Sequence, residues 1–449
     1  MMANNRIKWW KRRLSLAVRL TLILAVLLSV SSCGLPDKGH HDPLLVGEGP
    51  DAAPVEISIT YAMGDSAHQK GMQTMINNYK KSHLNVQIKV IGNTYQAKGY
   101  ADDLTLLDAM GTFPDLVEMR DTQMFADAGL LAELPASVQQ LFNDIPQVNG
   151  KIYTAPIQAE LPQGIIYNQR LFEELGLKEP STYAEFLEIC ETIKQAGISP
   201  IIVGGRDLWH MGFWINHFLL DDVYADDSEW NRKRNEGLVK WTDAGPSAAL
   251  KDLKELWDKE YVAPGFLNVS DSQTVGYLTA GKAAMLMSGP WMFTQLKELD
   301  PYFKIGFFPV PDREGNIHIT GLSLPTGWAI SAQAAEDPAK LRTIEQFLHF
   351  FYSAEEYSKY LTLTSALPAT KAPVQLEADL LVKEVQTLLA DPHVIKLRSM
   401  ENHWGANQIP PGFRNELYAF VQDYLSGHIS IQQALEQADE AWDTRDSKD

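Results

Sequence analysis

Residues 55–61 read Val55-Glu56-Ile57-Ser58-Ile59-Thr60-Tyr61, and apolar and polar side chains alternate along them without a break. Such alternation is typical of a β-strand with one buried face. Apolar residues then follow at helical spacing over 72–79, and a second strand pattern covers 86–91. A helix pattern over 101–110 and a strand over 115–119 continue the series. The order strand, helix, strand, helix, strand predicts an α/β fold with a mainly parallel sheet flanked by helices.

Helix signals become more frequent towards the C-terminus. Thr182 with Glu185, and Ser430 with Gln433, have the spacing of capping boxes, and Asp337-Pro338 places a cap residue before a helix-starting proline. Short strand patterns at 164–167, 284–287 and 327–331 lie between the helices. A chain of 449 residues exceeds what one core usually holds, so we expect two domains.

Residues 1–32 are predicted to be a signal peptide. Six basic residues and no acidic one accompany an apolar run over 20–30, which is too short to span a bilayer as a mature helix. Small residues precede Cys33, which is similar to a bacterial lipobox, so we expect acylation of its thiol and a lipid anchor at the cell membrane. An ordinary secretory signal is the alternative. Residues 33–53 are predicted to be a flexible tether.

Charge and cysteine content exclude several classes of protein. The chain carries 57 acidic and 39 basic residues, and six of the basic ones belong to the signal peptide. Nucleic-acid binding is therefore not expected, because no basic stripe is present to neutralise phosphates. The second cysteine, Cys190, falls on the apolar face of a helix pattern and is expected in the core, so no disulfide is predicted.

Motifs for catalysis, metals and cofactors are missing. The sequence has no C-x-x-C, H-E-x-x-H or G-x-S-x-G pattern. Residues 276–283 resemble a phosphate-binding loop, but Ala283 stands where a hydroxyl must bind magnesium. We expect no cofactor, no metal and no enzymatic activity. A glycoside hydrolase stays open as an alternative, because two catalytic carboxylates distant in sequence leave no local motif.

Several segments in order resemble one family, the extracellular solute-binding proteins of ABC importers, in the group that includes maltodextrin-binding proteins. The segments that carry the resemblance are 113–117 (Phe-Pro-Asp-Leu-Val), 128–134 (Ala-Gly-Leu-Leu-Ala-Glu-Leu), 152–156 (Ile-Tyr-Thr-Ala-Pro), 164–168 (Gly-Ile-Ile-Tyr-Asn), 281–291 (Gly-Lys-Ala-Ala-Met through Ser-Gly-Pro-Trp) and 327–331 (Gly-Trp-Ala-Ile-Ser).

The resemblance implies a two-lobed, type II periplasmic-binding-protein-like fold with a ligand cleft at the hinge. The expected N-terminal lobe comprises 54–160 and 327–388, and the expected C-terminal lobe comprises 161–326 and 389–449. It also implies a monomer that closes around a sugar or oligosaccharide outside the cytoplasm and delivers it to membrane permease subunits. A solute sensor for a membrane kinase would have the same sequence features.

A sugar site needs flat aromatic faces and hydrogen-bonding groups around them. Trp291 follows Gly289-Pro290 at a strand-to-helix turn, where side chains tend to face a ligand crevice. Resemblance to the family also assigns ligand contact to Trp291, to Glu160 near the first crossing between lobes, and to Trp404 in a non-periodic stretch. Asp65 follows the first strand and is either a ligand contact or a plain helix cap.

The stretch 207–214 gathers aromatic, acidic and imidazole side chains, so Asp207, His210 and Trp214 are further candidates for ligand contact. Trp328 is a weaker candidate, because a hinge or core role fits it better. The sequence departs from the maltodextrin pattern at two positions: Met119 and Thr122 stand where an aromatic residue and an acid are expected. This departure favours a saccharide other than maltose.

Overall fold

The computed structural model describes residues 54–63, 65–92, 99–143, 145–376 and 380–446. The predicted signal peptide, Cys33 and the predicted tether lie outside these ranges. Within them, no helix has both the length and the apolar character that crossing a bilayer requires.

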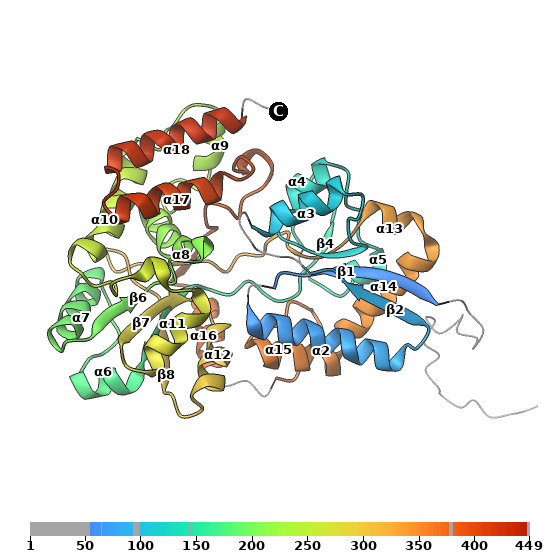
Figure 1. The fold of residues 1–449 in the computed structure, drawn as a ribbon, viewed down its shortest axis with the longest axis horizontal. Coiled ribbons are helices and arrows are strands. Elements are labelled where there is room, and N and C mark those ends of the chain that lie inside the picture. The colour runs from blue at the N-terminus through green and yellow to red at the C-terminus, as the bar shows by residue number, and fades with distance from the viewer. Residues whose placement is uncertain (1–53, 64, 93–98, 144, 377–379, 447–449) are drawn as a thin grey trace, which may run out of the picture. The chain divides into compact units, whose positions relative to one another are not determined.

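The first sheet has five strands in the order β2-β1-β3-β10-β4. Figure 1 labels β1, β2 and β4. Its strands are β1 (Val55–Thr60), β2 (Val86–Val90), β3 (Leu116–Met119), β4 (Thr154–Ala155) and β10 (Gly327–Ile330). The three strands predicted from the opening pattern therefore lie side by side. Asp115, just before β3, accepts hydrogen bonds from Ser58 N (2.7 Å) and Lys340 Nζ (2.8 Å), which ties this edge to a helix much later in the chain.

The second sheet has four strands in the order β6-β7-β5-β8, and a separate pair is formed by β9 and β11. The strands are β5 (Gly164–Asn168), β6 (Ser199–Ile202), β7 (Ala283–Ser288), β8 (Ile305–Phe308), β9 (Ile317–Ile319) and β11 (Val394–Lys396). The chain thus leaves the first sheet after β4, builds the second sheet, and returns to the first at β10.

Both sheets are mixed, so the prediction of mainly parallel sheets is wrong in this detail. β1 pairs in parallel with β2 and β3, and β6 pairs in parallel with β7. However, β10 is antiparallel to β3 and β4, and β5 is antiparallel to β7 and β8. The physical reason lies in how the chain enters these two strands. It reaches β5 from the first sheet and reaches β10 after it has left the second sheet, so neither strand follows the strand–helix–strand crossover within one sheet that produces parallel neighbours.

Helices cover the sheets. The helices up to the first crossing are α2 (Ser66–Ser82), α3 (Tyr100–Ala109), α4 (Thr122–Asp127) and α5 (Ala136–Gln139). The middle of the chain contains α6 (Gln169–Leu175), α7 (Tyr183–Gln195), α8 (Leu208–Leu219), the π-helical turn η1 (Leu220–Tyr224), α9 (Trp230–Asn235), α10 (Ala244–Asp258), η2 (Phe266–Asn268), α11 (Asp271–Thr279) and α12 (Met292–Leu299). The last part contains α13 (Ala332–Glu336), α14 (Pro338–Phe351), α15 (Ala354–Thr364), α16 (Leu380–Ala390), η3 (Gly405–Asn407), α17 (Phe413–Leu425) and α18 (Ile431–Asp446).

The predicted helix starts are confirmed. Thr182 Oγ1 accepts from Glu185 N (3.2 Å), and Asp337 Oδ1 accepts from Ala339 N (2.8 Å) with Pro338 at the first turn of α14. Ser430 and Gln433 form a full capping box, because each side chain accepts from the other's backbone N–H, at 3.2 and 2.8 Å.

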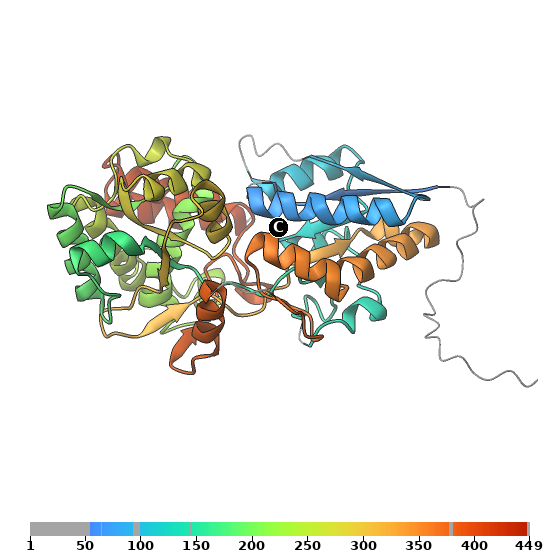
Figure 2. The same ribbon diagram turned by 90° about the horizontal axis from the view of Figure 1, so that it is seen from below.

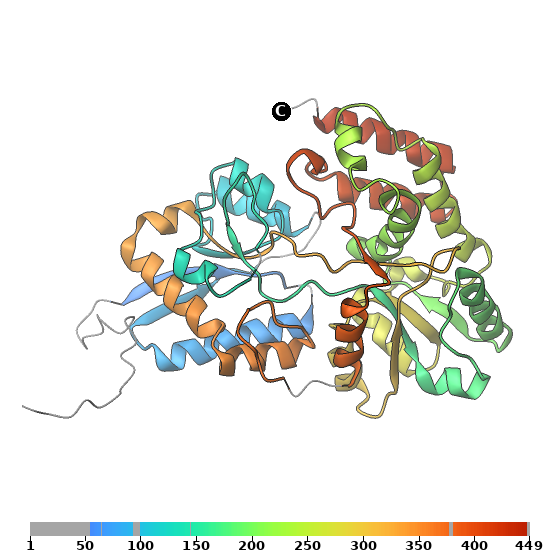
Figure 3. The same cartoon turned by 180° about the vertical axis from the view of Figure 1, so that it is seen from behind.

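Segments distant in sequence pack together around each sheet. Helices α2 and α15 lie side by side (Figure 2). Helix α16 contacts β8 of the second sheet (Figure 3), although its residues fall mostly within the range predicted for the first lobe. The lobe boundaries at Glu160, Gly327 and Leu388 stay predictions.

Gly327 begins the strand that returns to the first sheet. Its φ is 132°, in a region that side chains rarely adopt, and a β-carbon there would lie 2.0 Å from the carbonyl oxygen of Ala155. The close approach of two backbones at this point therefore requires glycine.

Candidate functional site

A buried carboxylate lies at the carboxyl end of β3. Glu118 is 5% exposed, and its Oε2 accepts from Ala62 N at 2.9 Å and lies 2.7 Å from His68 Nε2. Its Oε1 accepts from both Nε and a terminal nitrogen of Arg120, at 3.0 and 2.7 Å. The other ring nitrogen of His68 lies 2.9 Å from the hydroxyl of Tyr360. These four side chains form a continuous polar group, which we call the β3-edge cluster.

The β3-edge cluster presents a cation. Burial alone would raise the pKa of Glu118, but His68 and Arg120 outweigh burial and lower it well below its usual range. Glu118 is therefore ionised and anchors the guanidinium of Arg120 in a fixed orientation. About half of the Arg120 side chain is exposed (52%), so a planar donor group with a fixed orientation faces solvent.

Glu160 lies in the segment 156–163, which joins β4 of the first sheet to β5 of the second. Burial raises its pKa to about 7; the positive charge of Arg120 lowers it and the negative charge of Glu401 raises it. The carboxyl group predicted to contact ligand thus lies within electrostatic range of the β3-edge cluster and of a late segment of the chain. Near neutral pH, both protonation states of Glu160 are populated.

Trp291 is partly exposed at the start of α12 and packs against the hydrophobic clusters of both sheets. Its indole lies directly over Gly289, where a β-carbon would come within 1.9 Å of Cζ3. The ring of Phe213, on α8, has its centroid 5.8 Å away. Sequence therefore holds the indole in two ways: the glycine leaves room for it, and an aromatic neighbour supports it.

Trp404 precedes η3 and lies close to α4 and to the segment between α5 and β4. Its Nε1–H donates to the carbonyl of Gln147 (3.1 Å), and the next residue, Gly405, donates its N–H to Gln123 Oε1 (3.2 Å). The guanidinium carbon of Arg398 lies 4.7 Å from the centroid of the indole. One face of the Trp404 indole is thus covered by a cation, and the side chain also packs against the hydrophobic cluster that contains Tyr100 and Phe125.

Asp65 is the N-cap of α2, as the helix-cap alternative predicts. Its Oδ1 accepts from Ala67 N (2.8 Å) and His68 N (3.3 Å), and also from Gln295 Nε2 on α12 (3.4 Å). Burial raises its pKa, while His68 opposes the shift. Contact of Asp65 with a ligand stays a prediction.

Asp207 and His210 organise the start of α11. His210 is fully buried, with Nδ1 2.9 Å from Asp271 Oδ1, and Asp207 Oδ2 accepts from Asp271 N at 2.8 Å. The Nε2 atom of His210 is buried and has no hydrogen-bond partner among the described residues. These contacts give both residues a structural role, and His210 presents no exposed polar group in this conformation.

Trp214 and Trp328 are core residues with 0% exposure, which corrects their prediction as ligand contacts. Trp214 packs between Phe186 and Phe218 within the core of the second sheet, at centroid distances of 6.2 Å for both rings. Trp328, on β10, meets Phe347 and Phe351 of α14 edge-on. Neither indole has surface to offer a solute.

An open pocket of about 920 Å³ is lined by residues of α2, α11 and α12. Ser66 lines it from α2, and Tyr277, Gln295 and Leu299 are among the residues that line it from α11 and α12. None of the predicted contact residues lines the pocket, but two of its residues adjoin Asp65: Ser66 follows it, and Gln295 donates to it. Among the described residues, no group of three or more His, Cys, Asp and Glu side chains is placed to hold a metal ion.

A family model described as bacterial extracellular solute-binding protein matches residues 65–357. The chain belongs to this family. It is a family of extracellular binding proteins and not a class of enzymes.

Individual relatives of this solute-binding protein are distant. The multiple sugar-binding protein of Streptococcus mutans is 22% identical over 363 residues, covering 78% of this chain and 83% of the relative. Among solved structures, a chitin oligosaccharide binding protein has a TM-score of 0.76 at 23% identity, covering 88% of this chain and 99% of its own. The solute-binding protein RafE in complex with raffinose has a TM-score of 0.69 at 19% identity, covering 87% and 100%. These structures show that the fold is that of the type II sugar-binding proteins.

Two departures from the maltodextrin pattern are buried in this solute-binding protein. Met119 is 0% exposed, and Thr122 is 2% exposed and donates its hydroxyl to the carbonyl of Pro325. In their place, the exposed polar group at this edge is Arg120. The sequence analysis missed Glu118 and Arg120, although a signal was present. Two opposite charges two residues apart at the end of an apolar strand share one face of it and lie where α/β sheets bind ligands.

Proposed function

We propose that this solute-binding protein captures an extracellular carbohydrate, for which Trp291 supplies the stacking face and Arg120 and Glu160 supply hydrogen bonds to hydroxyl groups. The observation that carries the proposal is the partly exposed indole of Trp291, fixed over Gly289 and against Phe213. An exposed, immobilised aromatic face suits the apolar C–H face of a pyranose ring. The sugar-related names of the relatives in two separate comparisons point to the same class of cargo.

The polar partners fit hydroxyl groups. A guanidinium anchored by Glu118 donates in a fixed direction, and an ionised carboxylate accepts from hydroxyl protons more strongly than a neutral group. Arg120 and Glu160 interact electrostatically, so one sugar ring has a donor and an acceptor in the same neighbourhood. Trp404 and Asp65 complete the proposed contacts, and Trp214 and Trp328 are excluded from them.

Hinge closure is the proposed mechanism. The first lobe would contain the five-stranded sheet and the second lobe the four-stranded sheet, with crossings near Glu160 and Gly327. We place the third crossing before α16, since α16 contacts β8. Contacts of one ligand to both lobes would favour a closed form over an open one.

Delivery to a membrane permease completes the proposed role. The lipobox-like Cys33 would hold the monomer at the outer face of the cell membrane, and residues 33–53 would act as the tether. Mass spectrometry of the membrane-extracted protein tests the anchor: a diacylated Cys33 at the N-terminus supports it, and an unmodified N-terminus after cleavage elsewhere contradicts it.

A glycoside hydrolase is the second candidate, because one observation favours it. Glu160 has a pKa raised to about 7 by burial, and Glu401 is close enough to contribute to the shift. A carboxyl group that stays protonated near neutral pH, with a second carboxylate nearby, is what a general acid requires.

One experiment separates the two candidates. Purified protein is titrated calorimetrically with raffinose and with a chitin oligosaccharide, and the recovered sugars are analysed by chromatography. Saturable binding with intact sugar supports the binding protein. Release of shorter sugars that depends on Glu160 supports the hydrolase and contradicts the proposed function.

A further inference from the structure

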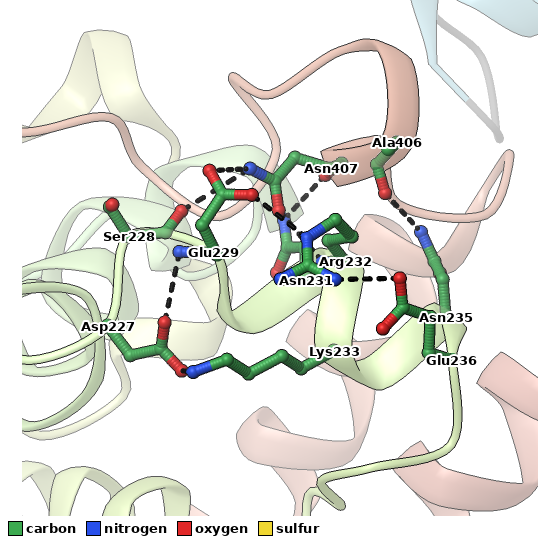
Figure 4. Close-up of polar contacts among 10 residues, drawn as sticks. All are labelled: Asp227, Ser228, Glu229, Asn231, Arg232, Lys233, Asn235, Glu236, Ala406 and Asn407. Atoms are coloured by element: carbon green, nitrogen blue, oxygen red, sulfur yellow. Dashed lines mark hydrogen bonds and ion pairs between the residues drawn. The ribbon is translucent and has the colours of Figure 1, made fainter.

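The residues around Trp404 form a loop held by one short helix, and Figure 4 shows the contacts of that helix with Ala406 and Asn407 of the loop. We call residues 400–408 the Trp404 loop; it contains η3. Helix α9 (Trp230–Asn235) lies against it, and the side chains of α9 meet its carbonyl groups. The loop makes few backbone hydrogen bonds to itself or to the residue before it among the described residues: Asn402 N donates to Ser399 O (2.9 Å) and Gln408 N to Gly405 O (3.1 Å).

Asn231 ties the two ends of the loop together. Its side chain is 0% exposed, and Nδ2 donates to the carbonyl of Met400 (2.9 Å) and to the carbonyl of Asn407 (3.1 Å). Its Oδ1 accepts from the hydroxyl of Tyr224 (2.7 Å), which fixes the orientation of the amide. A single buried side chain therefore satisfies one carbonyl near each end of the loop.

Asn235, one turn later on the same face of α9, repeats the arrangement. Its Nδ2 donates to the carbonyls of Ala406 and Gln408, both at 3.0 Å, and its Oδ1 accepts from Trp442 Nε1 (3.0 Å). The i, i+4 spacing places both amides on one stripe of the helix. In each amide, Oδ1 accepts a hydrogen bond from an aromatic side chain and Nδ2 donates to two carbonyl groups of the loop.

The loop's own Asn407 closes the contact from the other side. Its Oδ1 accepts from Arg232 N (2.8 Å), and its Nδ2 donates to Glu229 Oε1 (2.9 Å). The Arg232 side chain does not bond to Asn407; it pairs with the other oxygen of Glu229 (3.0 Å) and with Glu236 (2.7 Å). Among the described residues, the Arg232 side chain makes no hydrogen bond or ion pair to the loop itself.

The geometry points to Asn231 and Asn235 as positioning residues that fix the Trp404 loop, and with it the indole of Trp404, in the conformation that binds solute. The functional half of this inference rests on the proposed function. A loop with a fixed backbone restricts the side chains that it carries. The indole of Trp404 donates to Gln147 O, and Glu401 Oε1 accepts from Asn216 and Tyr418. Neither asparagine touches the solute; each acts through the loop.

Asn231→Asp is the sharpest probe of the clamp. The substitution keeps size and shape and retains the acceptor for Tyr224, but it replaces the Nδ2 donor with an oxygen that faces two carbonyl oxygens. The loop ends are then released, and the indole spends only part of its time in place. If a tenth of the molecules keep the competent loop, the apparent affinity falls about tenfold. Asn235→Asp, at a less buried site, is the second variant, and Arg232→Gln is the matched control.

The test does not depend on the identity of the solute. Tryptophan residues are labelled with ¹⁵N, and the indole peak that disappears in Trp404→Phe is assigned to Trp404 Nε1–H. In Asn231→Asp and Asn235→Asp we expect this peak to shift or broaden, while amide hydrogen exchange over 400–408 becomes about tenfold faster or more. Both should be unchanged in Arg232→Gln. Circular dichroism confirms that each variant is folded.

Two results overturn the inference. One is an unmoved Trp404 indole peak in both Asp variants; the other is unchanged exchange over 400–408. Raffinose titration of the same proteins tests the functional half: its affinity should fall about tenfold in the Asp variants and stay at the wild-type value in Arg232→Gln. Failure of the wild-type protein to bind raffinose counts against that cargo, not against the clamp, which the indole peak and the exchange rates decide.

Discussion

The six-membered ring of Trp291 rests on the backbone of Gly289, two residues earlier. A β-carbon at position 289 would come within 1.9 Å of Cζ3 and 2.2 Å of Cη2 of that ring. The indole is therefore placed by the absence of a side chain as much as by the packing of Phe213. The sequence Gly-Pro-Trp at the turn between β7 and α12 has a physical reason: a residue without a side chain at position 289 leaves room for the indole ring of Trp291.

Gly289→Ala is expected to displace the indole and weaken sugar binding about tenfold, close to the effect of Trp291→Ala. The overlap is with the side chain of Trp291, which can rotate away, so the fold should be retained. Titration calorimetry measures the affinity. Gly92→Ala is the matched control, because a β-carbon at Gly92 meets nothing within 4 Å. Wild-type affinity in Gly289→Ala would show that the indole position does not matter.

Sugar binding should depend on pH through Glu160. Its pKa is raised to about 7 by burial, and a hydroxyl donor prefers the ionised form, so binding should strengthen as pH rises through this value. Only about a tenth of Glu160 is ionised at about pH 6, so affinity there should be about tenfold weaker than at about pH 8. Calorimetry across this range measures the effect.

Glu160→Gln is the control for that dependence, because its amide does not titrate and the slope should disappear. The stability of the unliganded protein should change with pH in the opposite direction to the sugar affinity. A folded-state pKa above the ordinary value means that Glu160 binds its proton more tightly when folded, so its contribution to stability falls as pH rises from 4.5 to about 7. An affinity that is flat or decreasing over the same range would contradict the proposed role of the carboxylate.

Trp214→Ala should act on stability. The indole is 0% exposed within the core of the second sheet, so its removal leaves a large cavity and should lower the free energy of unfolding by about 3–5 kcal/mol. Urea unfolding followed by circular dichroism measures the change. Sugar affinity, measured where the variant is folded, should stay near the wild-type value. A large loss of affinity with little loss of stability would return Trp214 to the binding site.

Helix α12 also makes polar contacts with α2 and with the end of α15. Thr294 Oγ1 lies 2.7 Å from Ser365 Oγ at the end of α15, and Lys70 Nζ on α2 lies 2.5 Å from Glu298 Oε1. This contact joins the two proposed lobes, so a disulfide in the double variant Thr294→Cys, Ser365→Cys should block sugar entry under oxidising conditions, and reduction should restore entry.

Stopped-flow measurement of the association rate tests this lock, and each single cysteine variant is its control. Cys190 is fully buried, so it should not compete for the new thiols. An oxidised double variant that binds sugar at the wild-type rate would rule out a required hinge motion at this contact.

Periodicity in the sequence was sufficient for the α/β class, because the early strands and helices are neighbours along the chain. It was not sufficient for the mixed sheets. β10 pairs with β3 through Trp328 opposite Glu118, two segments about 200 residues apart, and no local pattern reports that pairing or its direction.

The candidate site was predictable where a residue follows a strand, and not where it lies on an apolar helix. Trp291 stands directly after β7 and was found. Trp214 belongs to α8, in which ten of twelve residues are buried, so sequence alone did not show which face meets the core. Arg120 was overlooked because its significance comes from Glu118, His68 and Glu160, which meet only in the folded chain.

The most direct test of the central claim is equilibrium unfolding of the protein with and without excess sugar, beginning with raffinose and chitin oligosaccharides. A cargo present at roughly 100- to 1,000-fold its dissociation constant should raise the free energy of unfolding by about 3 to 4 kcal/mol, and Trp291→Ala should lose part of that gain. Stabilisation by no sugar in a broad library, or equal stabilisation in Trp291→Ala, would contradict the claim that this indole receives a carbohydrate.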